Sequence, residues 1–393
     1  FLAVKKQMMG TNAGYRGAKD KWVKDWPGQL LITQGKVVFT KDCTKALHSV
    51  AKGNKKALKH VKKKQIGYIG KLSEMVRGQL SKIERKKVVA LITMEIHSRD
   101  VEERMIKGGA NHPEAFLWLS QLRFYYDKDA GDTGVGEVGA KQSNTSQIFG
   151  YEYQGNNGRL VVTALTDRCI ITLTTALFLQ RGGSPLGPAG TGKTETVKDL
   201  GKNLAKYVVV FNCSDSMDYR SVGRMFSGLV QTGGWGCFDE FNRIQIEVLS
   251  VIGQQVMSIM MAIRARKTEF SFMGVMIRCN WNCGIFITMN PGYAGRTELP
   301  DSLKAMFRPC AMMVPDYALI AEVMLFAKGF LDGTTLARKL TQVLRLSSEL
   351  LSSQMHYDYG MRAVFSILVR AGNLRLELGE VWTEDIIVLS AIV

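Results

Sequence analysis

One short stretch carries the chemistry that stands out most in this sequence. Gly187, Gly192, Lys193 and Thr194 occupy every fixed position of the phosphate-loop pattern G-x-x-x-x-G-K-[ST]. Glycines let a backbone wrap closely around a ligand, so that its N–H groups point at phosphate oxygens. A helix that begins near Lys193 would add the positive end of its dipole. The candidate loop consists of Gly187, Pro188, Ala189, Gly190, Thr191, Gly192, Lys193 and Thr194.

Taken alone, the pattern leaves one alternative, a glycine-rich turn that binds no ligand. In the nucleotide interpretation, Lys193 reaches the β- and γ-phosphates of ATP, and the Thr194 hydroxyl coordinates Mg²⁺. With Gly at ~7% of residues, four fixed positions match by accident in on the order of 1% of chains this long. We therefore favour nucleotide binding.

A pair of carboxylates provides the second candidate for chemistry. Asp239 and Glu240 follow the apolar run 235–238, at the end of an expected buried strand, where ligands bind in open α/β sheets. In phosphate-loop nucleotidases the aspartate at this position holds Mg²⁺, usually through water, and an adjacent glutamate can polarise the attacking water as a general base. A purely structural Asp-Glu pair is the alternative. The position of the pair, on the next strand but one after the loop, favours catalysis.

Two further polar residues extend this candidate site. Asn290 ends the apolar run 284–289 and is placed to hydrogen-bond the γ-phosphate or the lytic water. The alternative is a turn asparagine before Pro291. Arg362 lies in the helical tail, and it can reach the nucleotide if that tail folds down as a lid. The alternative for Arg362 is a surface salt bridge.

Strands and helices that alternate around these residues must position them. The alternation predicts an α/β domain with a mainly parallel sheet, and helical periodicity predicts a helical lid after it. The expected strands are 160–162, one short strand before the loop, 207–212, 235–238 and 284–289. The expected helices are 166–179, 195–206, 221–230 and 244–264, and a hairpin is expected at 270–277.

The first third of the chain has a different character. Residues 1–125 show helical periodicity, and 129–146 are rich in Gly, Thr, Ser and Asp, which predicts a loop or linker. An apolar cluster is expected to pack between helices: Trp118, Leu119, Leu122, Phe124 and Tyr125. We predict a mostly helical domain at 1–150, a large α/β subdomain at 151–315 and a small helical subdomain at 316–393. The chain is expected to be a piece of a longer protein.

Composition argues against several other classes. The net charge is +17, and about +16 of it falls in residues 1–107, which can bind nucleic acid or an acidic filament. The lysine runs there lack interleaved aromatic residues, so we favour a solvated helical surface and expect no nucleic-acid partner. The stretch 312–330 is broken by charged residues, so no membrane span is expected. Seven scattered cysteines predict a reducing, intracellular compartment and no zinc site.

Longer motifs resemble one family. The runs 187–195, 237–243, 286–296, 299–309 and 356–360 resemble the first AAA+ module of a dynein heavy chain. Upstream, 26–29, 95–100 and 118–123 resemble the C-terminal part of the dynein linker. The compact segment 290–300 is more similar to axonemal than to cytoplasmic dyneins.

The resemblance implies a role for each candidate residue. The loop and Glu195 would form the Walker A motif, Asp239 and Glu240 the Walker B pair, Asn290 sensor I and Arg362 sensor II. Val161 and Val162 would help to wall the adenine. Arg308 resembles an arginine finger, which serves the site of a neighbouring module.

The resemblance also implies a P-loop AAA+ ATPase that converts ATP and water to ADP and phosphate, with Mg²⁺ as cofactor. Hydrolysis would swing the linker of a minus-end-directed microtubule motor in the cytoplasm and cytoskeleton, within the axoneme of a cilium or flagellum. The implied partners are microtubules through regions outside this chain, further AAA+ modules of the same heavy chain, and intermediate and light chains. The alternatives are a regulatory module that binds nucleotide without hydrolysis and, from another class, a nucleic-acid translocase.

Overall fold

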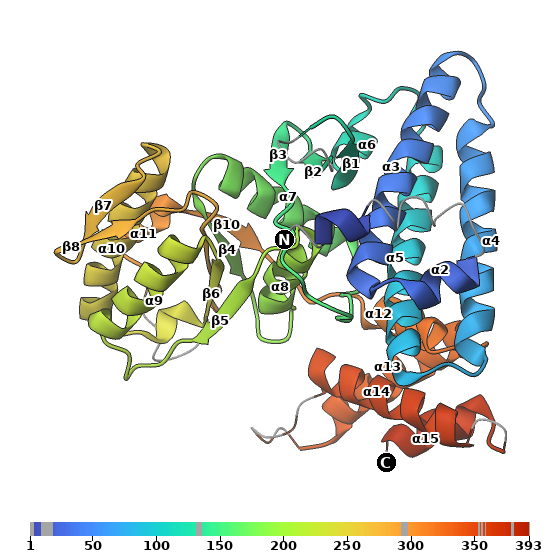
Figure 1. Ribbon diagram of the computed structural model, residues 1–393. Coiled ribbons are helices and arrows are strands. Elements are labelled where there is room, and N and C mark those ends of the chain that lie inside the picture. The colour runs from blue at the N-terminus through green and yellow to red at the C-terminus, as the bar shows by residue number, and fades with distance from the viewer. Residues whose placement is uncertain are drawn as a thin grey trace. The chain divides into compact units, whose positions relative to one another are not determined.

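The chain forms two compact units, which are described separately (Figure 1). Unit 1 contains Ser120–Tyr153 and Ala164–Val314, and unit 2 contains Leu2–Leu119, Gln154–Thr163 and Pro315–Val393. This computed structural model describes residues 4–8, 19–130, 136–291, 298–352, 354, 357, 359–378 and 381–392.

A five-stranded parallel sheet organises unit 1, in the strand order β10-β4-β9-β6-β5. Its strands are β4 (Gly182–Leu186), β5 (Val208–Asn212), β6 (Trp235–Asp239), β9 (Gly284–Ile287) and β10 (Phe307–Ala311). Every residue of β9, and every residue of β6 before Asp239, is buried. Apolar runs of this kind form central strands covered on both faces, so the predicted parallel sheet is confirmed.

Helices cover this sheet and give unit 1 its core. They are α7 (Ala164–Phe178), α8 (Lys193–Asn203), α9 (Tyr219–Thr232), α10 (Ile246–Arg264) and α11 (Asp301–Met306), with a short 3₁₀ helix, η1 (Phe241–Arg243). Phe238 of β6 is fully buried. Its ring lies 5.0 Å from that of Phe211, 4.9 Å from that of Phe226 and 6.2 Å from that of Phe241, between centroids. Phe238 therefore joins the sheet to α9 and to η1.

Helix α10 is long and apolar enough to cross a membrane by length and composition, with half of that stretch buried in the protein. Its inward residues, among them Leu249, Ile252 and Val256, belong to the core of unit 1. Burial in this core accounts for the apolar character of the helix.

A three-stranded antiparallel sheet corrects the prediction of a loop or linker at 129–146. Its strands are β1 (Arg123–Asp127), β2 (Glu137–Gln142) and β3 (Thr145–Ile148). In β2, the buried residues Val138, Ala140 and Gln142 alternate with less buried ones, as in a strand with one covered face. This alternation was already present in the sequence, although the segment is rich in polar and small residues. Gln142 accepts a hydrogen bond from Thr174 of α7 at 2.8 Å. This hydrogen bond to a helix that is distant in sequence holds the polar face of the sheet against α7.

Two other expectations need correction. Leu160–Val162 lies in irregular chain and not in a strand. Val161 packs instead into an apolar cluster of unit 2, which removes it from water without sheet pairing. The aromatic cluster at 118–125 is also divided. Trp118 is buried among helices, whereas Phe124 belongs to β1.

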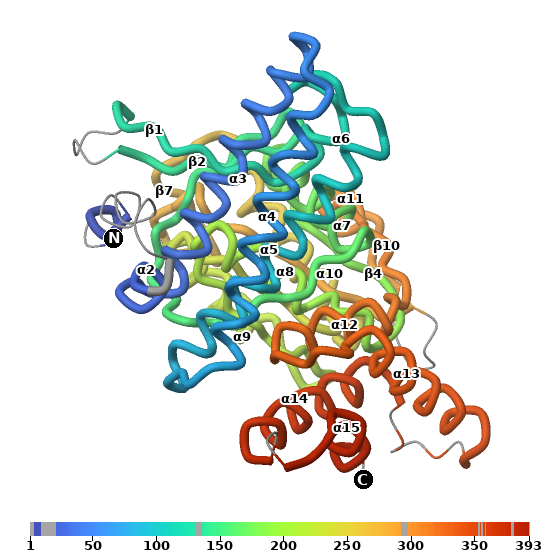
Figure 2. The backbone as a smooth tube through the Cα atoms, turned by 90° about the vertical axis from the view of Figure 1, so that its right-hand side faces the viewer, coloured from blue at the N-terminus to red at the C-terminus, as the bar shows by residue number. Residues whose placement is uncertain are grey.

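Unit 2 is helical, as predicted for most of 1–125 and for 316–393. In Figures 1 and 2, the long helices α3, α4 and α5 run side by side. The first group is α2 (Lys19–Asp25), α3 (Gly28–Ala51), α4 (Ala57–Arg77), α5 (Lys82–Lys107) and α6 (Phe116–Leu119). The second group is α12 (Tyr317–Ala327), α13 (Gly333–Leu350), α14 (Met361–Leu378) and α15 (Glu384–Ile392).

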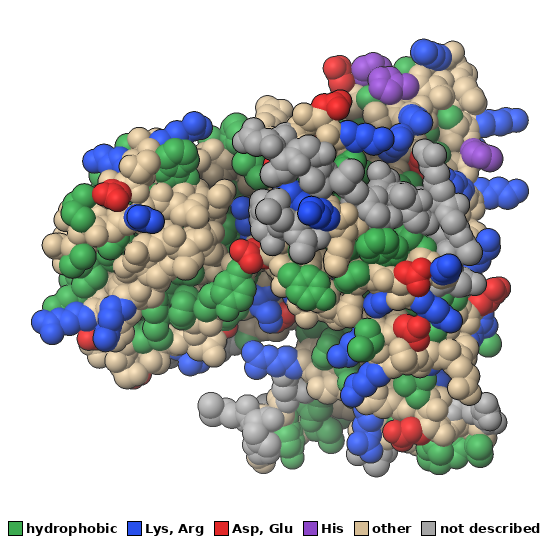
Figure 3. All heavy atoms as spheres, in the orientation of Figure 1, with side chains coloured by type: hydrophobic (Ala, Val, Ile, Leu, Met, Phe, Trp, Pro, Cys, Tyr) green, Lys and Arg blue, Asp and Glu red, His purple; other side chains and the backbone are tan. Residues whose placement is uncertain are grey.

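The basic residues of unit 2 follow the expectation of a solvated surface. Lys55, Lys56, Lys63 and Lys64 are exposed, on or beside α4. On the face shown in Figure 3, lysine and arginine side chains are scattered among other side chains and do not form one continuous patch. Exposed lysines are ordinary for a water-facing helix.

We expect Phe238→Ala to destabilise the chain by about 3–5 kcal/mol, because the substitution leaves a cavity among three other aromatic rings. The measurement is the free energy of unfolding, from urea denaturation followed by circular dichroism. Phe178→Ala is the matched control, since Phe178 is 50% exposed, and it should change this free energy by less than about 0.5 kcal/mol. Equal losses in the two variants would contradict the central place of Phe238.

Candidate functional site

The candidate phosphate loop connects β4 to α8, as the pattern predicts. Gly190 and Gly192 adopt φ values of 75° and 80°, in the left-handed region that glycine tolerates best. Gly187 is restricted by space, because a Cβ atom there would lie 2.1 Å from the carbonyl oxygen of Met312. Gly190 and Gly192 are therefore needed for the backbone conformation of the loop, and Gly187 is needed because the Met312 backbone approaches it closely.

Lys193 begins α8, and its ammonium group turns back towards the loop. Its Nζ donates to the carbonyl oxygens of Gly187 at 2.8 Å and Pro188 at 2.6 Å. Lys193 is only 7% exposed. A buried ammonium is stable where oxygen acceptors surround it, so the structure keeps a positive charge at the inner side of the loop.

Asp239 ties the loop helix to two strands. Its Oδ1 accepts hydrogen bonds from the hydroxyls of Thr194 and Thr288, each at 2.5 Å. Thr194 is the second residue of α8, Asp239 ends β6, and Thr288 follows β9 directly. The structure thus brings together Thr194 and Asp239, the two residues that the sequence predicts to hold Mg²⁺. Hydroxyl and carboxylate oxygens are suitable ligands for this hard cation.

Glu240 is fixed by several donors next to this group. It is a non-glycine residue with a φ of 53°, and its backbone N–H donates to the Thr288 hydroxyl at 3.1 Å. Asn290 donates from Nδ2 to Oε1 of Glu240 at 3.0 Å, and Arg243 forms an ion pair with Oε2. Strained backbone at a candidate site is stable only where its surroundings hold it in place. The structure therefore brings Glu240 and Asn290 together, as the sequence predicts.

Asn290 also has a free acceptor. Its Oδ1 is buried and has no hydrogen-bond partner among the described residues. A buried carbonyl oxygen without a donor costs about 1–3 kcal/mol. A buried acceptor of this kind in a native structure calls for a structural or functional explanation.

The two carboxylates affect a neighbouring thiol. Burial raises the pKa of Cys213 to about 12, and the negative charges of Asp239 and Glu240 contribute to the shift. The Cys213 N–H donates to the carbonyl oxygen of Asp239 at 3.0 Å, which fixes the end of β6 against the chain after β5.

The surroundings of the other predicted residues differ from one to the next. Glu195 is exposed and pairs with Lys198 at 2.5 Å, and Arg308 is exposed on β10. Val161, Val162 and Arg362 belong to unit 2, with Arg362 exposed in the first turn of α14. Their roles stay predictions. Part of the predicted axonemal segment 290–300, namely 292–297, lies outside the described residues.

Three residues of the network were missed from the sequence. Thr288 bridges Asp239 and Glu240, Arg243 pairs with Glu240, and Asn242 donates from Nδ2 to the carbonyl oxygen of Asn290 at 3.2 Å. A signal was present for Thr288, a polar residue inside an apolar run. The other two depend on the turn after β6, which the sequence does not specify.

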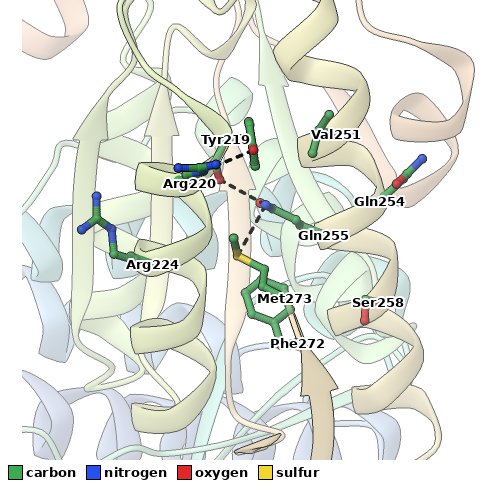
Figure 4. Close-up of a pocket in the computed structure, with 9 residues that line it drawn as sticks. All are labelled: Tyr219, Arg220, Arg224, Val251, Gln254, Gln255, Ser258, Phe272 and Met273. Atoms are coloured by element: carbon green, nitrogen blue, oxygen red, sulfur yellow. Dashed lines mark hydrogen bonds between the residues drawn. The ribbon is translucent and has the colours of Figure 1, made fainter. Parts of the chain in front are cut away.

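A groove of about 840 Å³ lies in unit 1 beside α9, α10 and the hairpin of β7 (Glu269–Phe272) and β8 (Val275–Arg278) (Figure 4). Gln255 crosses it, donating from Nε2 to the carbonyl oxygen of Tyr219 at 3.1 Å. Its lining consists of Tyr219, Arg220, Arg224, Val251, Gln254, Gln255, Ser258, Phe272 and Met273. None of these is a predicted nucleotide residue, so this groove is separate from the phosphate-loop site.

Comparison with known proteins gives the family. Residues 149–393 match the family described as the hydrolytic ATP binding site of the dynein motor region. This chain belongs to the dynein heavy chain family. The predicted AAA+ P-loop fold, with a helical part before it, is thereby confirmed.

Dynein heavy chains of other organisms are similar to nearly the whole of this chain. The dynein-1-beta heavy chain of the flagellar inner arm I1 complex from Chlamydomonas reinhardtii is 53% identical over 98% of this chain. Human dynein axonemal heavy chain 2 is 55% identical over 95% of it. The chain spans 8% of the length of each of these relatives.

A solved structure, the RuvB Holliday junction branch migration motor of Thermotoga maritima, is also similar, with a TM-score of 0.38 and 13% identity. The similarity covers 58% of this chain and 67% of that one.

We expect Gly187→Ala to lower the ATP affinity of this dynein segment at least about tenfold, because the new methyl group would displace the loop from the Met312 carbonyl. Isothermal titration calorimetry measures the affinity. Gly228→Ala is the control, because a Cβ there meets no atom within 4 Å in α9, and it should leave the affinity unchanged. Equal affinity of the Gly187→Ala and native proteins would contradict this account of the loop.

We expect Thr288→Val to slow ATP hydrolysis about 10- to 100-fold, because it removes one hydroxyl that contacts both Asp239 and the Glu240 backbone. Single-turnover kinetics measure the rate. Thr288→Ser keeps the hydroxyl and should retain most of it. If the valine and serine variants hydrolyse ATP equally fast, the hydroxyl has no part in positioning the carboxylates.

Proposed function

We propose that this chain is the ATP-hydrolysing motor module of an axonemal dynein heavy chain, comprising the C-terminal part of the linker and the first AAA+ module. The observation that supports it most is the network in which Asp239 accepts from Thr194 of the loop helix while Glu240 is held beside it by Asn290. A loop lysine, two adjacent carboxylates and a polar residue on the next strand are the groups that ATP hydrolysis needs.

Nucleotide binding would use the loop first. Its N–H groups and the α8 N-terminus favour the phosphates, and Lys193 would exchange its two loop carbonyl partners for β- and γ-phosphate oxygens. Thr194 and Asp239 would hold Mg²⁺. The oxygen donors present fit that ion, and when bound it neutralises charge that develops on the phosphates.

Hydrolysis would use Glu240 as general base and Asn290 as its positioning partner. The Asn290 amide already contacts the Glu240 carboxylate, and its partnerless Oδ1 provides an acceptor for a lytic water. Arg243, paired with the other carboxylate oxygen, restrains the orientation of Glu240. A base must lie within hydrogen-bond reach of the water that it deprotonates.

The remaining predicted residues complete the proposal. Val161 and Val162 would wall the adenine, and Arg362 would contact the γ-phosphate as sensor II. Arg308, exposed on the edge strand β10, would serve a neighbouring module as an arginine finger. The domains would be the linker part at 1–150, the large subdomain at 151–315 and the small subdomain at 316–393.

In the whole heavy chain, hydrolysis here would swing the linker and drive minus-end-directed movement along microtubules. The partners would be further AAA+ modules, intermediate and light chains, and microtubules bound by regions outside this chain. The names of the relatives, which are axonemal or flagellar dyneins, support a location in the axoneme of a cilium or flagellum. A regulatory module that binds nucleotide without hydrolysis is the competing function.

We expect Glu240→Gln in the complete heavy chain to lower microtubule-stimulated ATP turnover about 10²- to 10⁴-fold, because the amide cannot accept the water proton. ATP affinity should stay close to the native value, since the loop is unchanged. Steady-state hydrolysis with and without microtubules, together with nucleotide titration, measures both quantities.

Glu247→Gln serves as the control, because Glu247 is an exposed glutamate in the first turn of α10 and should leave turnover unchanged. If turnover survives in Glu240→Gln, another module carries the hydrolytic cycle. This segment is then the nucleotide-holding regulator.

A further inference from the structure

The groove between α9, α10 and the β7–β8 hairpin has no part in the proposed ATP chemistry (Figure 4). Helix α9 provides one wall and α10 the other, with the tip of the hairpin between them. Arg220 and Arg224 belong to the α9 wall, and both are exposed. Residues four apart lie on one face of a helix, so the two guanidinium groups serve the same side of the groove.

The positive charge of this wall is not balanced within unit 1. Arg220 donates from Nε to the Tyr219 hydroxyl at 3.2 Å, and its guanidinium carbon lies 5.7 Å from the centre of that ring. The nearby carboxylate of Asp218 caps α9 by accepting from the Ser221 N–H at 2.8 Å. Among the described residues, neither Arg220 nor Arg224 forms an ion pair with a carboxylate, and no acidic residue lines the groove. The groove therefore favours an anionic occupant.

A buried acceptor lies in the same groove. Gln255 is only 8% exposed, and its Nε2 donates to the carbonyl oxygen of Tyr219 at 3.1 Å and contacts the sulfur of Met273 at 3.6 Å. Its Oε1 has no hydrogen-bond partner among the described residues. Buried acceptors are almost always paired, so this atom indicates a ligand that carries a hydrogen-bond donor.

An apolar surface adjoins the arginines and is shaped by the tip of the hairpin. Met273 and Gly274 form the turn with φ values of 52° and 82°, a conformation that methionine seldom adopts. Gly223 of α9 leaves room for this methionine, because a Cβ there would lie 2.3 Å from its sulfur. Met273 is 49% exposed, and Val251 on the opposite wall is 37% exposed. Flexible methionine side chains adapt to the surface of a binding partner.

We propose that this groove binds an acidic polypeptide segment of a partner protein, in which carboxylate side chains alternate with apolar ones. In an extended segment, alternate side chains point to opposite sides. Its carboxylates would pair with Arg220 and Arg224, whose planar guanidinium groups match a carboxylate in geometry. Its apolar side chains would pack on Val251 and Met273. When the Met273 side chain turns aside, a backbone N–H of the segment can donate to Oε1 of Gln255.

The chemistry of the groove distinguishes this occupant from two others. A small anion could meet the arginines, but it brings neither an N–H donor for the buried acceptor nor an apolar group for the hairpin. A basic segment would be repelled by the arginine wall. Only an acidic polypeptide supplies negative charge, donors and apolar side chains together.

The first test measures binding of a fluorescein-labelled peptide of alternating glutamate and leucine to the purified, intact heavy-chain complex, by fluorescence anisotropy without nucleotide. This peptide should bind on the order of tenfold more tightly than one of alternating lysine and leucine, and its affinity should fall as the salt concentration rises. Equal affinity for the two peptides would overturn the proposal. Inorganic phosphate that displaces the peptide at a similar concentration would reveal a small-anion site and overturn it as well.

Charge reversal locates the binding. Arg220→Glu and Arg224→Glu should each weaken binding of the acidic peptide about tenfold, because each replaces an attraction by a repulsion. Arg264→Glu is the matched control, since Arg264 is an exposed arginine at the end of α10 and does not line the groove. The control should bind the peptide as the native complex does. The same affinity in all three variants would place the peptide elsewhere and contradict the assignment.

Hydrogen exchange needs no variant, so it holds even where a substitution impairs folding. The acidic peptide should slow amide exchange in native residues 219–224 and 272–275, while helix α13 at 333–350 serves as the unchanged reference. Slower exchange confined to other segments would overturn the proposal. Self-association of the native complex in sedimentation velocity that Arg224→Glu abolishes would assign the groove to a second copy, against a separate acidic partner.

Discussion

The carboxylate of Asp239 is the acceptor on which the geometry of the candidate site depends. One of its oxygens accepts a hydrogen bond from a hydroxyl of the loop helix α8 and another from the hydroxyl just after β9. A single atom of β6 is thus joined to two elements that are distant from it in sequence. Hydrogen bonds to a carboxylate are shorter and stronger than neutral ones, so they hold the three elements together firmly. Without these hydrogen bonds, only the sheet would align the loop helix with the ends of β6 and β9.

The parallel sheet brings together the residues that form these hydrogen bonds to Asp239. Strands β4, β9 and β6 lie side by side, so their carboxyl ends reach the same edge and place the loop, Asn290 and Asp239 next to each other. Thr288 then links Asp239 to the backbone of Glu240, whose left-handed conformation turns its side chain towards Asn290. The core around Phe238 packs against β6, while the candidate site residues lie at the strand ends and in the turns that follow them.

The border between β4 and β10 limits the space around the loop. The Met312 N–H donates to the carbonyl oxygen of Leu186 at 2.6 Å, and a Cβ atom on Gly187 would lie 2.1 Å from the Met312 carbonyl oxygen. The edge strand β10, paired in parallel with β4, therefore helps to fix the shape of the loop.

The sequence by itself determined the loop, the carboxylate pair, the alternation of strands and helices from β4 to β9, and the family. These features depend on local patterns, namely glycine spacing, apolar runs and long motifs. Only the tertiary structure decided that Thr288 and Arg243 hold the carboxylates, that 137–148 forms strands, and that Val161 packs in a helical unit without a strand. Thr288 and Val161 depend on partners far along the chain, and Arg243 depends on the turn that brings it back to Glu240. Local propensity carries no information about such contacts.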